Sequence, residues 1–236
     1  MHDLTNDDLS PIGQSLDDRR PRFLRDIIGQ DTIVKRLQQA ARSGHLPHLR
    51  AFIGPSGSGK TTLATVTARM QFCPRSAELG DACGLCQTCR LSNLDSFECF
   101  HEWTGAELEQ NWSWWTECGT AALSRPGWIL ILDEAQDLSR THQKALFRQL
   151  ERAIATVILA TTHRQQIVEA LLNRFGANVF EVRRPTIDQA VALMERQCST
   201  LGVHASRSLL SRAAEHYVLD LRKCVDLIYT ARDQTP

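Results

Sequence analysis

A glycine-rich stretch, GPSGSGKT at residues 54–61, constrains the fold of this chain more than any other segment. It fits the phosphate-binding pattern G-x-x-x-x-G-K-[ST], in which glycines let backbone N–H groups approach phosphate oxygens. The pattern carries this meaning only between a strand and a helix. The short apolar run 49–53 precedes it, and residues 60–72 carry apolar side chains among good helix formers. The sequence therefore predicts a strand, a phosphate-binding loop and a helix whose positive end faces the phosphates.

The last two residues of the loop carry the side chains that phosphate chemistry requires. Lys60 is placed to reach the β- and γ-phosphates, and Thr61 is placed to ligate Mg²⁺. The alternative is an accidental Gly/Ser turn, which the flanking strand and helix disfavour. The predicted nucleotide-binding residues of this segment are Gly54, Pro55, Ser56, Gly57, Ser58, Gly59, Lys60, Thr61 and Thr62.

The composition is that of an ordinary globular protein. Of 236 residues, 42% are hydrophobic and 23% are charged. No apolar run approaches the ~20 residues of a membrane span, and the N-terminus lacks a basic-then-apolar signal. We therefore expect a cytoplasmic protein without membrane contacts. The formal net charge is zero, so any contact with DNA has to be local.

The pattern along the chain divides it into three regions. Residues 1–19 are polar and acidic, which predicts a flexible leader. Residues 20–183 alternate strand-like runs with helical patterns, which predicts an α/β nucleotide-binding domain, and Asp31 is expected to cap its first helix. Beyond Pro185 the pattern is helical only, so we expect an all-helical domain at 184–236. The predicted strands are 49–53, 97–103, 128–136, 156–162 and 178–182, and further helices are predicted over 60–72, 141–152, 187–201, 206–217 and 221–232.

Four cysteines follow the predicted helix of the loop in a C-x9-C-x2-C-x2-C pattern. Tight x2 loops present adjacent sulfurs, and the longer loop returns the first cysteine, so all four thiolates can converge on one tetrahedral zinc. Zinc would hold together an insertion, 73–89, that is too small and polar to bury a core of its own. Four unrelated thiols are the alternative. The predicted zinc ligands are Cys73, Cys83, Cys86 and Cys89.

Two other groups of side chains have less definite meanings. The remaining cysteines, at 99, 118, 198 and 224, have no such spacing and are expected to be ordinary buried thiols. Tryptophans cluster between 103 and 115, which suits either a base-stacking or partner surface or a helix packed on the sheet. Packing is favoured because no basic residue lies between the tryptophans, and their role is left unassigned.

A second motif of phosphate chemistry lies in WILILDEAQ, residues 128–136, where an apolar strand ends in two acids. Asp133, at the carboxyl end of the predicted strand, can hold Mg²⁺ through water. Glu134 can orient and activate the attacking water. A solvated acidic turn is the alternative, but the position of the motif after a phosphate loop makes the catalytic interpretation stronger.

The order of these motifs resembles that of the AAA+ ATPases, and within them the gamma/tau subunits of the bacterial DNA polymerase III clamp loader. The resemblance covers about residues 20–232. It rests on RPRFLRDIIGQ before the loop, the four-cysteine insertion, LILDEAQ, LATT, an arginine after a short helix, and LDLRK near the end. The cysteine insertion at this position is the most specific of these marks. The resemblance implies an α/β AAA+ P-loop fold, in which a parallel-sheet domain with a zinc insertion precedes a small all-helical lid domain.

The resemblance also implies roles for single residues. Thr162 is similar to sensor 1, which reads the γ-phosphate, and Arg174 is similar to the arginine finger that reaches into a neighbouring subunit's site. Arg222 is similar to sensor 2, which couples the lid to the nucleotide. For both arginines an ordinary surface charge is the alternative. The segment implied to pack against adenine holds Arg20, Pro21, Ile28 and Gly29; Lys60 and Thr61 match Walker A, and Asp133 and Glu134 match Walker B.

The activity implied by the resemblance is ATP-dependent loading of a sliding clamp on primed DNA in DNA replication. ATP, Mg²⁺ and Zn²⁺ are the implied cofactors, and the implied partners are other clamp-loader subunits, the sliding clamp and primer-template DNA in an oligomer. The chain departs from the family where Asn173 and Phe175 flank Arg174 and where His163 follows the sensor 1 position. The sequence also ends after the helical lid, so we expect it to lack the family's C-terminal collar domain.

Two other functions fit the same motifs. The first is a short nucleotide-gated AAA+ interaction module with little turnover of its own. The second is an ATPase of a mobile element or phage that shares the clamp-loader core. Hydrolysis measured with and without primed DNA separates the motor from the module.

Overall fold

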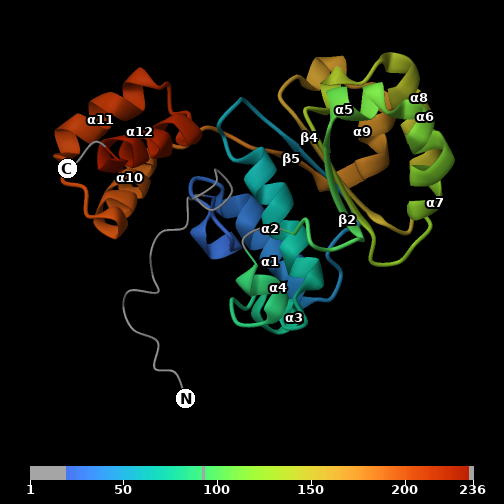
Figure 1. Ribbon diagram of the computed structural model, residues 1–236, viewed down its shortest axis with the longest axis horizontal. Helices are drawn as coiled ribbons and strands as arrows, with labels where there is room; N and C mark the ends of the chain where they lie inside the picture. The colour runs from blue at the N-terminus through green and yellow to red at the C-terminus, as the bar shows by residue number, and fades with distance from the viewer. Residues whose placement is uncertain (1–19, 92–93, 234–236) are drawn as a thin grey trace.

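The computed structural model describes residues 20–91 and 94–233, and the predicted leader 1–19 lies outside these residues. An α/β part and a helical part follow one another along the chain (Figure 1). The α/β part is built on one sheet, and the helical part consists of three helices after Pro185. Within the described residues, no helix is both long and apolar enough to cross a membrane.

The sheet has five parallel strands in the order β2-β3-β4-β1-β5. The strand before the phosphate loop, β1, is therefore paired on both sides, with Ala51 opposite Leu159 of β4 and Val179 of β5. Parallel strands bring their carboxyl ends to one edge of the sheet, where ligands of such folds bind. The strands are β1 Leu49–Ile53, β2 Phe100–Thr104, β3 Ile129–Asp133, β4 Thr156–Thr161 and β5 Val179–Glu181.

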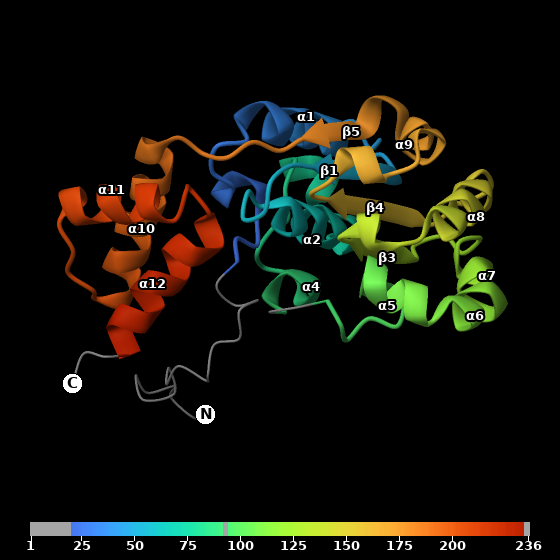
Figure 2. The same ribbon diagram turned by 90° about the horizontal axis from the view of Figure 1, so that it is seen from above.

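Helices cover both faces of the sheet, so its central strands are buried almost throughout (Figure 2). Alternate residues of β3 serve opposite faces: Ile129 and Ile131 pack with the helices α1 and α2, whereas Leu130 and Leu132 pack with α5, α8 and α9. The helices of this part are α1 Asp31–Arg42, α2 Lys60–Phe72, α3 Ser76–Leu79, α4 Gln87–Arg90, α5 Gly105–Gln110, α6 Trp112–Trp114, α7 Thr120–Ala122, α8 Arg140–Leu150 and α9 Glu169–Phe175.

The helical part buries a small core of its own. Its three helices are α10 Ile187–Leu201, α11 Arg207–His216 and α12 Leu221–Asp233. Met194, Leu210 and Ile228 lie at the centre of this core, one from each helix. A second, smaller cluster of Leu193, Val225 and Tyr229 packs against Ile28 of the N-terminal segment. The helical part therefore touches the α/β part beside the phosphate loop.

Several predicted boundaries differ from those of the structure. The strand expected over 97–103 begins at Phe100, because turns with hydrogen bonds from Phe97 to Leu94 and from Phe100 to Phe97 occupy the preceding residues. The predicted capping role of Asp31 is wrong, since Gln30 is the N-cap residue and Asp31 is the first residue of α1. An acidic side chain in the first turn still interacts favourably with the helix dipole.

The tryptophan cluster mostly serves packing. Trp115 is buried, and its indole Nε1 donates a hydrogen bond to Gln149 Oε1 (2.8 Å). Trp112 stacks on His142 with ring centroids 4.0 Å apart, and Trp114 is exposed. Among the other cysteines, Cys198 and Cys224 are buried as expected, Cys99 is half-buried, and Cys118 is exposed. The expectation of a buried thiol at position 118 is therefore wrong.

One buried cation in β1 has no ionic partner among residues 20–91 and 94–233. The Arg50 guanidinium is fully buried and donates to the Pro47 carbonyl and to Gln71 Oε1, while its Nε has no partner in the described part of the chain. Burial lowers the pKa of Arg50 to about 9. Desolvation of such a group costs free energy, and hydrogen bonds to one carbonyl and one side-chain amide offset that cost only in part.

Replacing Arg50 with methionine is expected to raise the free energy of unfolding by about 1–3 kcal/mol, because an apolar side chain of similar length avoids desolvating a charge. Urea titrations at neutral pH measure the difference. The matched control is Arg125→Met, which removes an exposed guanidinium and is expected to change stability little. A destabilised Arg50→Met protein would show that the two hydrogen bonds of Arg50 outweigh its burial.

Candidate functional site

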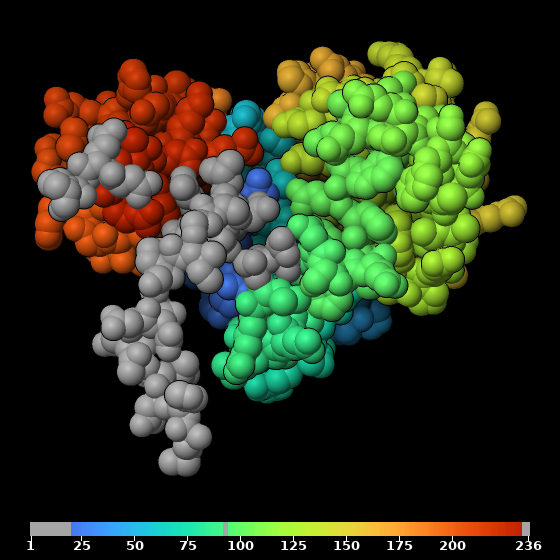
Figure 3. Space-filling view, viewed as in Figure 1, coloured from blue at the N-terminus to red at the C-terminus, as the bar shows by residue number. Residues whose placement is uncertain are grey.

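A cavity of about 480 Å³ lies between the phosphate loop, the N-terminal segment and the helical part. Its volume falls in the range typical of small-molecule sites, about 300–1,000 Å³. In Figure 3, the orange-to-red residues of the helical part form one lobe and the green-to-yellow residues of the α/β part form another. The predicted residues that line the cavity are Arg20, Pro21, Ile28, Ser56, Gly57, Ser58, Gly59, Lys60, Thr61, Thr62, Glu134 and Arg222.

The phosphate loop has the backbone conformation that its glycines permit. Gly57 and Gly59 have φ values of 71° and 97°, in the left-handed region that favours glycine. Helix α2 begins at Lys60, so the free N–H groups of its first turn face the cavity. The Lys60 ammonium is buried and donates to the Pro55 carbonyl (3.1 Å). Burial lowers the pKa of Lys60, and the nearby carboxylates of Glu134 and Asp133 oppose that shift.

The loop and strand β3 meet through a short hydrogen bond. Thr61 Oγ1 donates to Asp133 Oδ2 at 2.7 Å, and the second carboxylate oxygen of Asp133 accepts from the backbone N–H of Glu134 (2.8 Å). A hydroxyl and a carboxylate are oxygen ligands of the kind that Mg²⁺ takes beside a bound phosphate. These two residues therefore fit the donor set of a nucleotide-bound magnesium ion.

Glu134 has an unusual backbone conformation and a carboxylate that accepts hydrogen bonds on one oxygen. Its φ of 44° is left-handed, which is rare for a residue with a side chain. One carboxylate oxygen accepts hydrogen bonds from Gln136 Nε2 (2.8 Å) and Thr162 Oγ1 (2.9 Å). Burial alone would raise the pKa of Glu134, but these hydrogen bonds and the charge of Lys60 outweigh it and lower the pKa. The carboxylate is therefore ionised at neutral pH and can accept a proton.

Other predicted residues lie beside the cavity rather than on its wall. Thr162 is not among the described residues that line the cavity, but its hydroxyl donates to Glu134, which is. Gly29 has a φ of 76°, and a Cβ there would come within 3.2 Å of Pro185, so it permits a tight approach to the start of the helical part. Gly54, Pro55 and Asp133 are further predicted residues that are not part of the lining.

Arg174 lies away from the cavity of its own chain. Its guanidinium donates to the carbonyls of Leu150 (3.4 Å) and Glu151 (2.6 Å) at the C-terminal end of α8. Carbonyls at the last turn of a helix are underused as acceptors, and a cation at this end of a helix is favourable. Within one chain, Arg174 therefore acts on α8 and not on the phosphate loop.

The helical part touches the phosphate loop directly, which the sequence did not indicate. The backbone N–H of Leu221 donates to the Gly57 carbonyl (3.1 Å), and the Asp220 side chain packs against Gly57. Asp220 also accepts from the backbone N–H groups of Arg222 (3.1 Å) and Lys223 (3.3 Å) at the start of α12. The orientation of α12, and with it the position of Arg222, is tied to the loop.

Replacing Gly57 with alanine is expected to weaken nucleotide binding by about tenfold or more. A Cβ at this position would lie 2.1 Å from the Asp220 carboxylate, and the left-handed backbone costs a further ~1–2 kcal/mol. Titration with a fluorescent ATP analogue measures the effect. Gly44→Ala is the matched control, because Gly44 has a similar φ of 72° and no atom within 4 Å of the new Cβ. Equal affinity of the two variants for the analogue would contradict a role of the contact between the loop and α12 in nucleotide binding.

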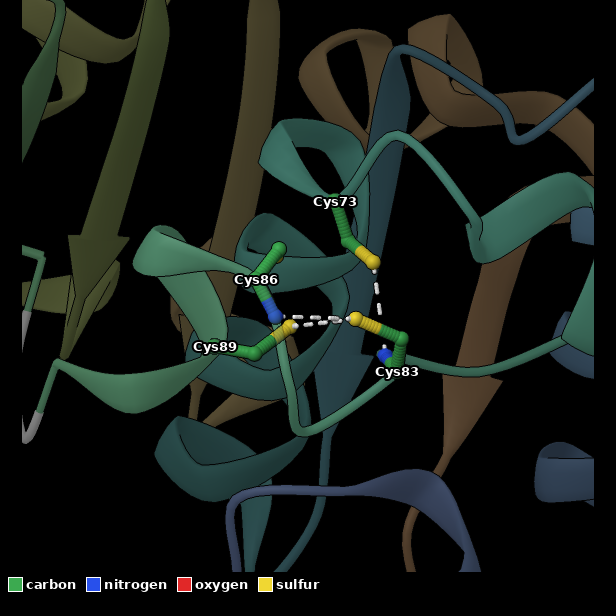
Figure 4. A group of neighbouring side chains, drawn as sticks. All are labelled: Cys73, Cys83, Cys86 and Cys89. Carbon is green, nitrogen blue, oxygen red and sulfur yellow. Dashed lines mark hydrogen bonds between the residues drawn. The ribbon is translucent and has the colours of Figure 1, made fainter.

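The four predicted zinc ligands converge. The Sγ atoms of Cys73, Cys83, Cys86 and Cys89 all lie within 4.8 Å of one another (Figure 4). The Sγ atoms of Cys83 and Cys89 are 3.9 Å apart. This distance is close to the ~3.8 Å expected between two sulfur ligands of a tetrahedral zinc at a Zn–S distance of about 2.3 Å. The donor set therefore fits zinc, and four protein ligands close the site.

The environment of the cluster favours the thiolate form of one cysteine, Cys83. The backbone N–H groups of Cys86 (3.3 Å) and Leu85 (3.4 Å) donate to Cys83 Sγ and lower the pKa of this thiol to about 6. The backbone N–H of Cys83 donates in turn to Cys73 Sγ (3.3 Å). Burial has the opposite effect on Cys89 and raises its pKa to about 12. Hydrogen bonds to the ligands of a metal site orient those ligands and tune the metal.

Sequence reasoning missed three groups around the site. Gln136 belongs to the quoted DEAQ motif, and its place two residues after Glu134 was the available signal. Asp220 belongs to LDLRK, a motif in which the sequence assigned a role to Arg222 alone. Asp81 lies between the cysteines, and no pattern in the sequence relates it to residues 24 and 25, which it contacts.

Comparison with known proteins identifies the class. Residues 51–183, more than half of the chain, match the model of the ATPase family associated with various cellular activities (AAA). The chain belongs to this family and is an ATPase of the P-loop class.

Individual relatives are more specific. The chain is 34% identical to a replication factor C small subunit of Methanoregula boonei over 179 residues, 73% of this chain and 48% of the relative. It is 27% identical to the DNA polymerase III subunit tau of Salmonella typhimurium over 222 residues, 91% of this chain and 34% of the relative. The chain thus spans half or less of the length of these curated relatives. By family it is an AAA ATPase, and in sequence it is similar to replication factor C small subunits and to DNA polymerase III tau subunits.

Solved structures support the fold. The Thermotoga maritima RuvB Holliday junction branch migration motor superposes with a TM-score of 0.64 over 92% of this chain and 66% of that chain, at 23% identity. At this identity the likeness concerns the fold alone. It extends across both the parallel-sheet part and the helical part, which agrees with the expected AAA+ architecture.

Proposed function

We propose that this chain binds ATP with Mg²⁺ in the cavity between the phosphate loop and the helical part, and hydrolyses it as a subunit of a clamp loader. One observation carries the proposal: Lys60, the Thr61–Asp133 pair and the ionised Glu134 meet at the carboxyl edge of the parallel sheet. Phosphoryl transfer requires this combination of a cation, a metal site and a base.

In the proposed mechanism, Lys60 exchanges its hydrogen bond to the Pro55 carbonyl for the β- and γ-phosphates. Thr61 and Asp133 are the residues that would hold Mg²⁺, and the ion would supply neutralisation of phosphate charge. Glu134 accepts a proton from the attacking water. Thr162, hydrogen-bonded to the Glu134 carboxylate, orients that base and acts as sensor 1.

The base and ribose of the nucleotide occupy the other end of the cavity. Arg20, Pro21, Ile28 and Gly29 belong to the segment that packs against adenine, with Gly29 forming the turn behind the wall. Arg222 reaches the phosphates from the start of α12, as sensor 2. Its proximity to Lys60, whose pKa it lowers, supports this placement.

The proposed domains follow from this arrangement. Residues 20–183 form the nucleotide-binding domain, 73–89 its zinc insertion, and 184–236 the lid. Zinc held by the four cysteines is structural, because a site closed by four protein ligands offers no position to a substrate.

The proposed partners are other clamp-loader subunits, a sliding clamp and primer-template DNA, in an oligomer. Relatives named as replication factor C small subunits and DNA polymerase III tau support this assignment. Arg174 completes the site of a neighbouring subunit after it leaves the α8 carbonyls.

A nucleotide-gated interaction module is the second candidate. It is favoured by the hydrogen bonds that hold Arg174 on α8 of its own chain, away from the cavity. A chain in this state contributes no arginine finger to a neighbouring subunit's site and turns over slowly by itself. The two candidates differ in whether primed DNA and a clamp raise the rate.

Steady-state hydrolysis of the wild type and of Glu134→Gln tests the motor. We expect weak basal turnover that rises with primed DNA and clamp, and a kcat lower by about 10²-fold in the variant, because general-base catalysis is lost. The affinity for ATP should stay within a fewfold, since the amide keeps the shape of the side chain. A basal rate that neither DNA nor clamp raises would favour the module, and an unchanged kcat in Glu134→Gln would reject Glu134 as the base.

A further inference from the structure

The N-terminal segment beside the cavity contains a short 3₁₀ turn, η3 Leu24–Asp26, that takes its cap from a distant residue. The preceding residue, Phe23, offers no side-chain hydrogen bond to the turn. Instead the backbone N–H groups of Leu24 and Arg25 donate to the two oxygens of Asp81, at 2.9 and 3.1 Å. Free N–H groups at the start of a helical turn need such an acceptor. The turn therefore depends on Asp81.

Asp81 belongs to the four-cysteine insertion and is buried, with 4% of its surface exposed. The oxygen that accepts from Leu24 also accepts from the backbone N–H of Ala82 (2.8 Å), the residue directly before Cys83. Arg25 adds an ion pair to Asp81 (3.4 Å) and a hydrogen bond to the Ala82 carbonyl (3.2 Å). The position of the carboxylate is thus fixed by backbone next to a cysteine of the cluster.

The other end of the insertion holds the same segment. Arg22 donates to the carbonyls of Cys89 (2.8 Å) and Leu91. Gly84, between two cysteines, packs against the Phe23 ring, from which a Cβ would lie 3.4 Å away. Contacts from both ends of the cysteine cluster therefore converge on residues 22–25.

The opposite side of the same turn faces the cavity. Ile27 and Ile28 follow η3 directly and line the cavity wall. Asp26 pairs with Arg196 of α10 (3.7 Å), and Ile28 packs against the helical part. A displacement of η3 would consequently move the wall of the cavity and its contact with the helical part together.

We propose that Asp81 is a positioning residue that couples the metal state of the four-cysteine cluster to nucleotide affinity. The inference rests on the proposed nucleotide and zinc sites and goes beyond them by linking the two. With zinc bound, the insertion has one conformation and presents the Asp81 carboxylate to η3. Without it, a segment too small to bury a core loses that order, η3 loses its cap, and nucleotide binding has to order the wall again. By thermodynamic reciprocity, nucleotide strengthens zinc binding by the same factor.

The experiment measures the affinity of the full chain for a fluorescent ATP analogue in four states: wild type and Asp81→Asn, each with zinc and after removal of zinc by a chelator. We expect one zinc per chain in both proteins by atomic absorption. Affinity should fall on the order of tenfold when zinc leaves the wild type, within the range usual for coupled sites. Zinc-loaded Asp81→Asn should already be weakened to a similar extent, and its zinc removal should add less than about twofold.

A second readout reports the turn without any nucleotide. Hydrogen exchange at the amides of Leu24 and Arg25 should quicken in zinc-free wild type and in zinc-loaded Asp81→Asn. The matched control is Glu78→Gln, which changes the same charge in the same insertion at a residue that pairs with Arg75 and not with η3. We expect wild-type affinity and exchange rates in this control.

Three results would overturn the coupling: unchanged affinity in zinc-loaded Asp81→Asn, an equal effect of zinc removal in both proteins, or equal weakening in Glu78→Gln. If the zinc-free protein unfolds, the coupling is tested by the nucleotide affinity and the exchange rates of the zinc-loaded Asp81→Asn protein. Failure of the proposed nucleotide site has a different signature, since zinc-loaded wild type would then not bind the analogue at all.

Discussion

Replacing Lys60 with alanine is expected to abolish productive use of ATP. The ammonium lies in the cavity wall, and its charge, close to the carboxylates of Asp133 and Glu134, would face the β- and γ-phosphates. Removal of one preorganised donor typically costs 10²–10³ in rate, and Lys60 also contributes to binding, so kcat/KM should fall by about 10³-fold or more. Hydrolysis at a range of ATP concentrations measures this loss.

Lys144→Ala is the matched control for this variant. Lys144 is an exposed lysine on α8, and its removal should leave both kcat and KM within about twofold of the wild type. Undiminished turnover in Lys60→Ala would reject the assignment of the phosphate loop. A comparable loss in Lys144→Ala would point to a general effect on folding instead.

Removal of the metal is the second large effect that we expect. Structural zinc contributes ~10–16 kcal/mol of binding free energy to isolated small domains, and all four thiols of the insertion converge on one place. Cys83→Ser should reduce the zinc content from about one to near zero per chain and lower the free energy of unfolding by about 3 kcal/mol or more. Atomic absorption and thermal unfolding measure the two quantities.

Cys118→Ser removes an exposed thiol outside the cluster and should alter neither zinc content nor stability. A Cys83→Ser protein that binds no less zinc than the wild type would show that the metal, where present, lies elsewhere. Wild-type protein that is fully folded and free of metal would contradict the proposed zinc site.

The local motifs could be predicted because their geometry is encoded in neighbouring residues. The order of strand, glycine loop and helix fixes the direction of the loop's N–H groups. Parallel strands also bring their carboxyl ends together, so a Walker B acid had to lie near Thr61; the observed hydrogen bond of 2.7 Å to Asp133 agrees with that expectation. The convergence of the four cysteines could also be predicted, because they lie within one short segment.

Contacts between distant segments could not be predicted in this way. Leu24 and Asp81 are 57 residues apart in sequence, and neither residue carries a motif that indicates the other. The docking of Leu221 on the Gly57 carbonyl depends on how the helical part packs as a whole. Arg174 shows a related limit. The sequence placed it after a short helix, where it resembled a finger, whereas the structure places it in the last turn of α9, and its hydrogen bonds to the α8 carbonyls arise from tertiary packing.

Strand ends were also set by tertiary context. The residues before β2 have the apolar character of a strand, yet Phe97 stacks on Phe72 of α2 with ring centroids 4.7 Å apart, which holds that segment on the helix. Pairing with β3 begins only at Phe100, opposite Ile129. The alternation of side chains alone does not contain this information.

The most direct test of the clamp-loader assignment is recovery of partners by tagged Glu134→Gln protein from its own cells, with ATP present and with ATP removed, followed by mass spectrometry. The variant is expected to hold ATP without hydrolysing it, so it should retain the sliding clamp and other loader subunits only when ATP is present. Recovery of proteins without clamp or loader subunits, or of the same proteins in both conditions, would contradict the assignment.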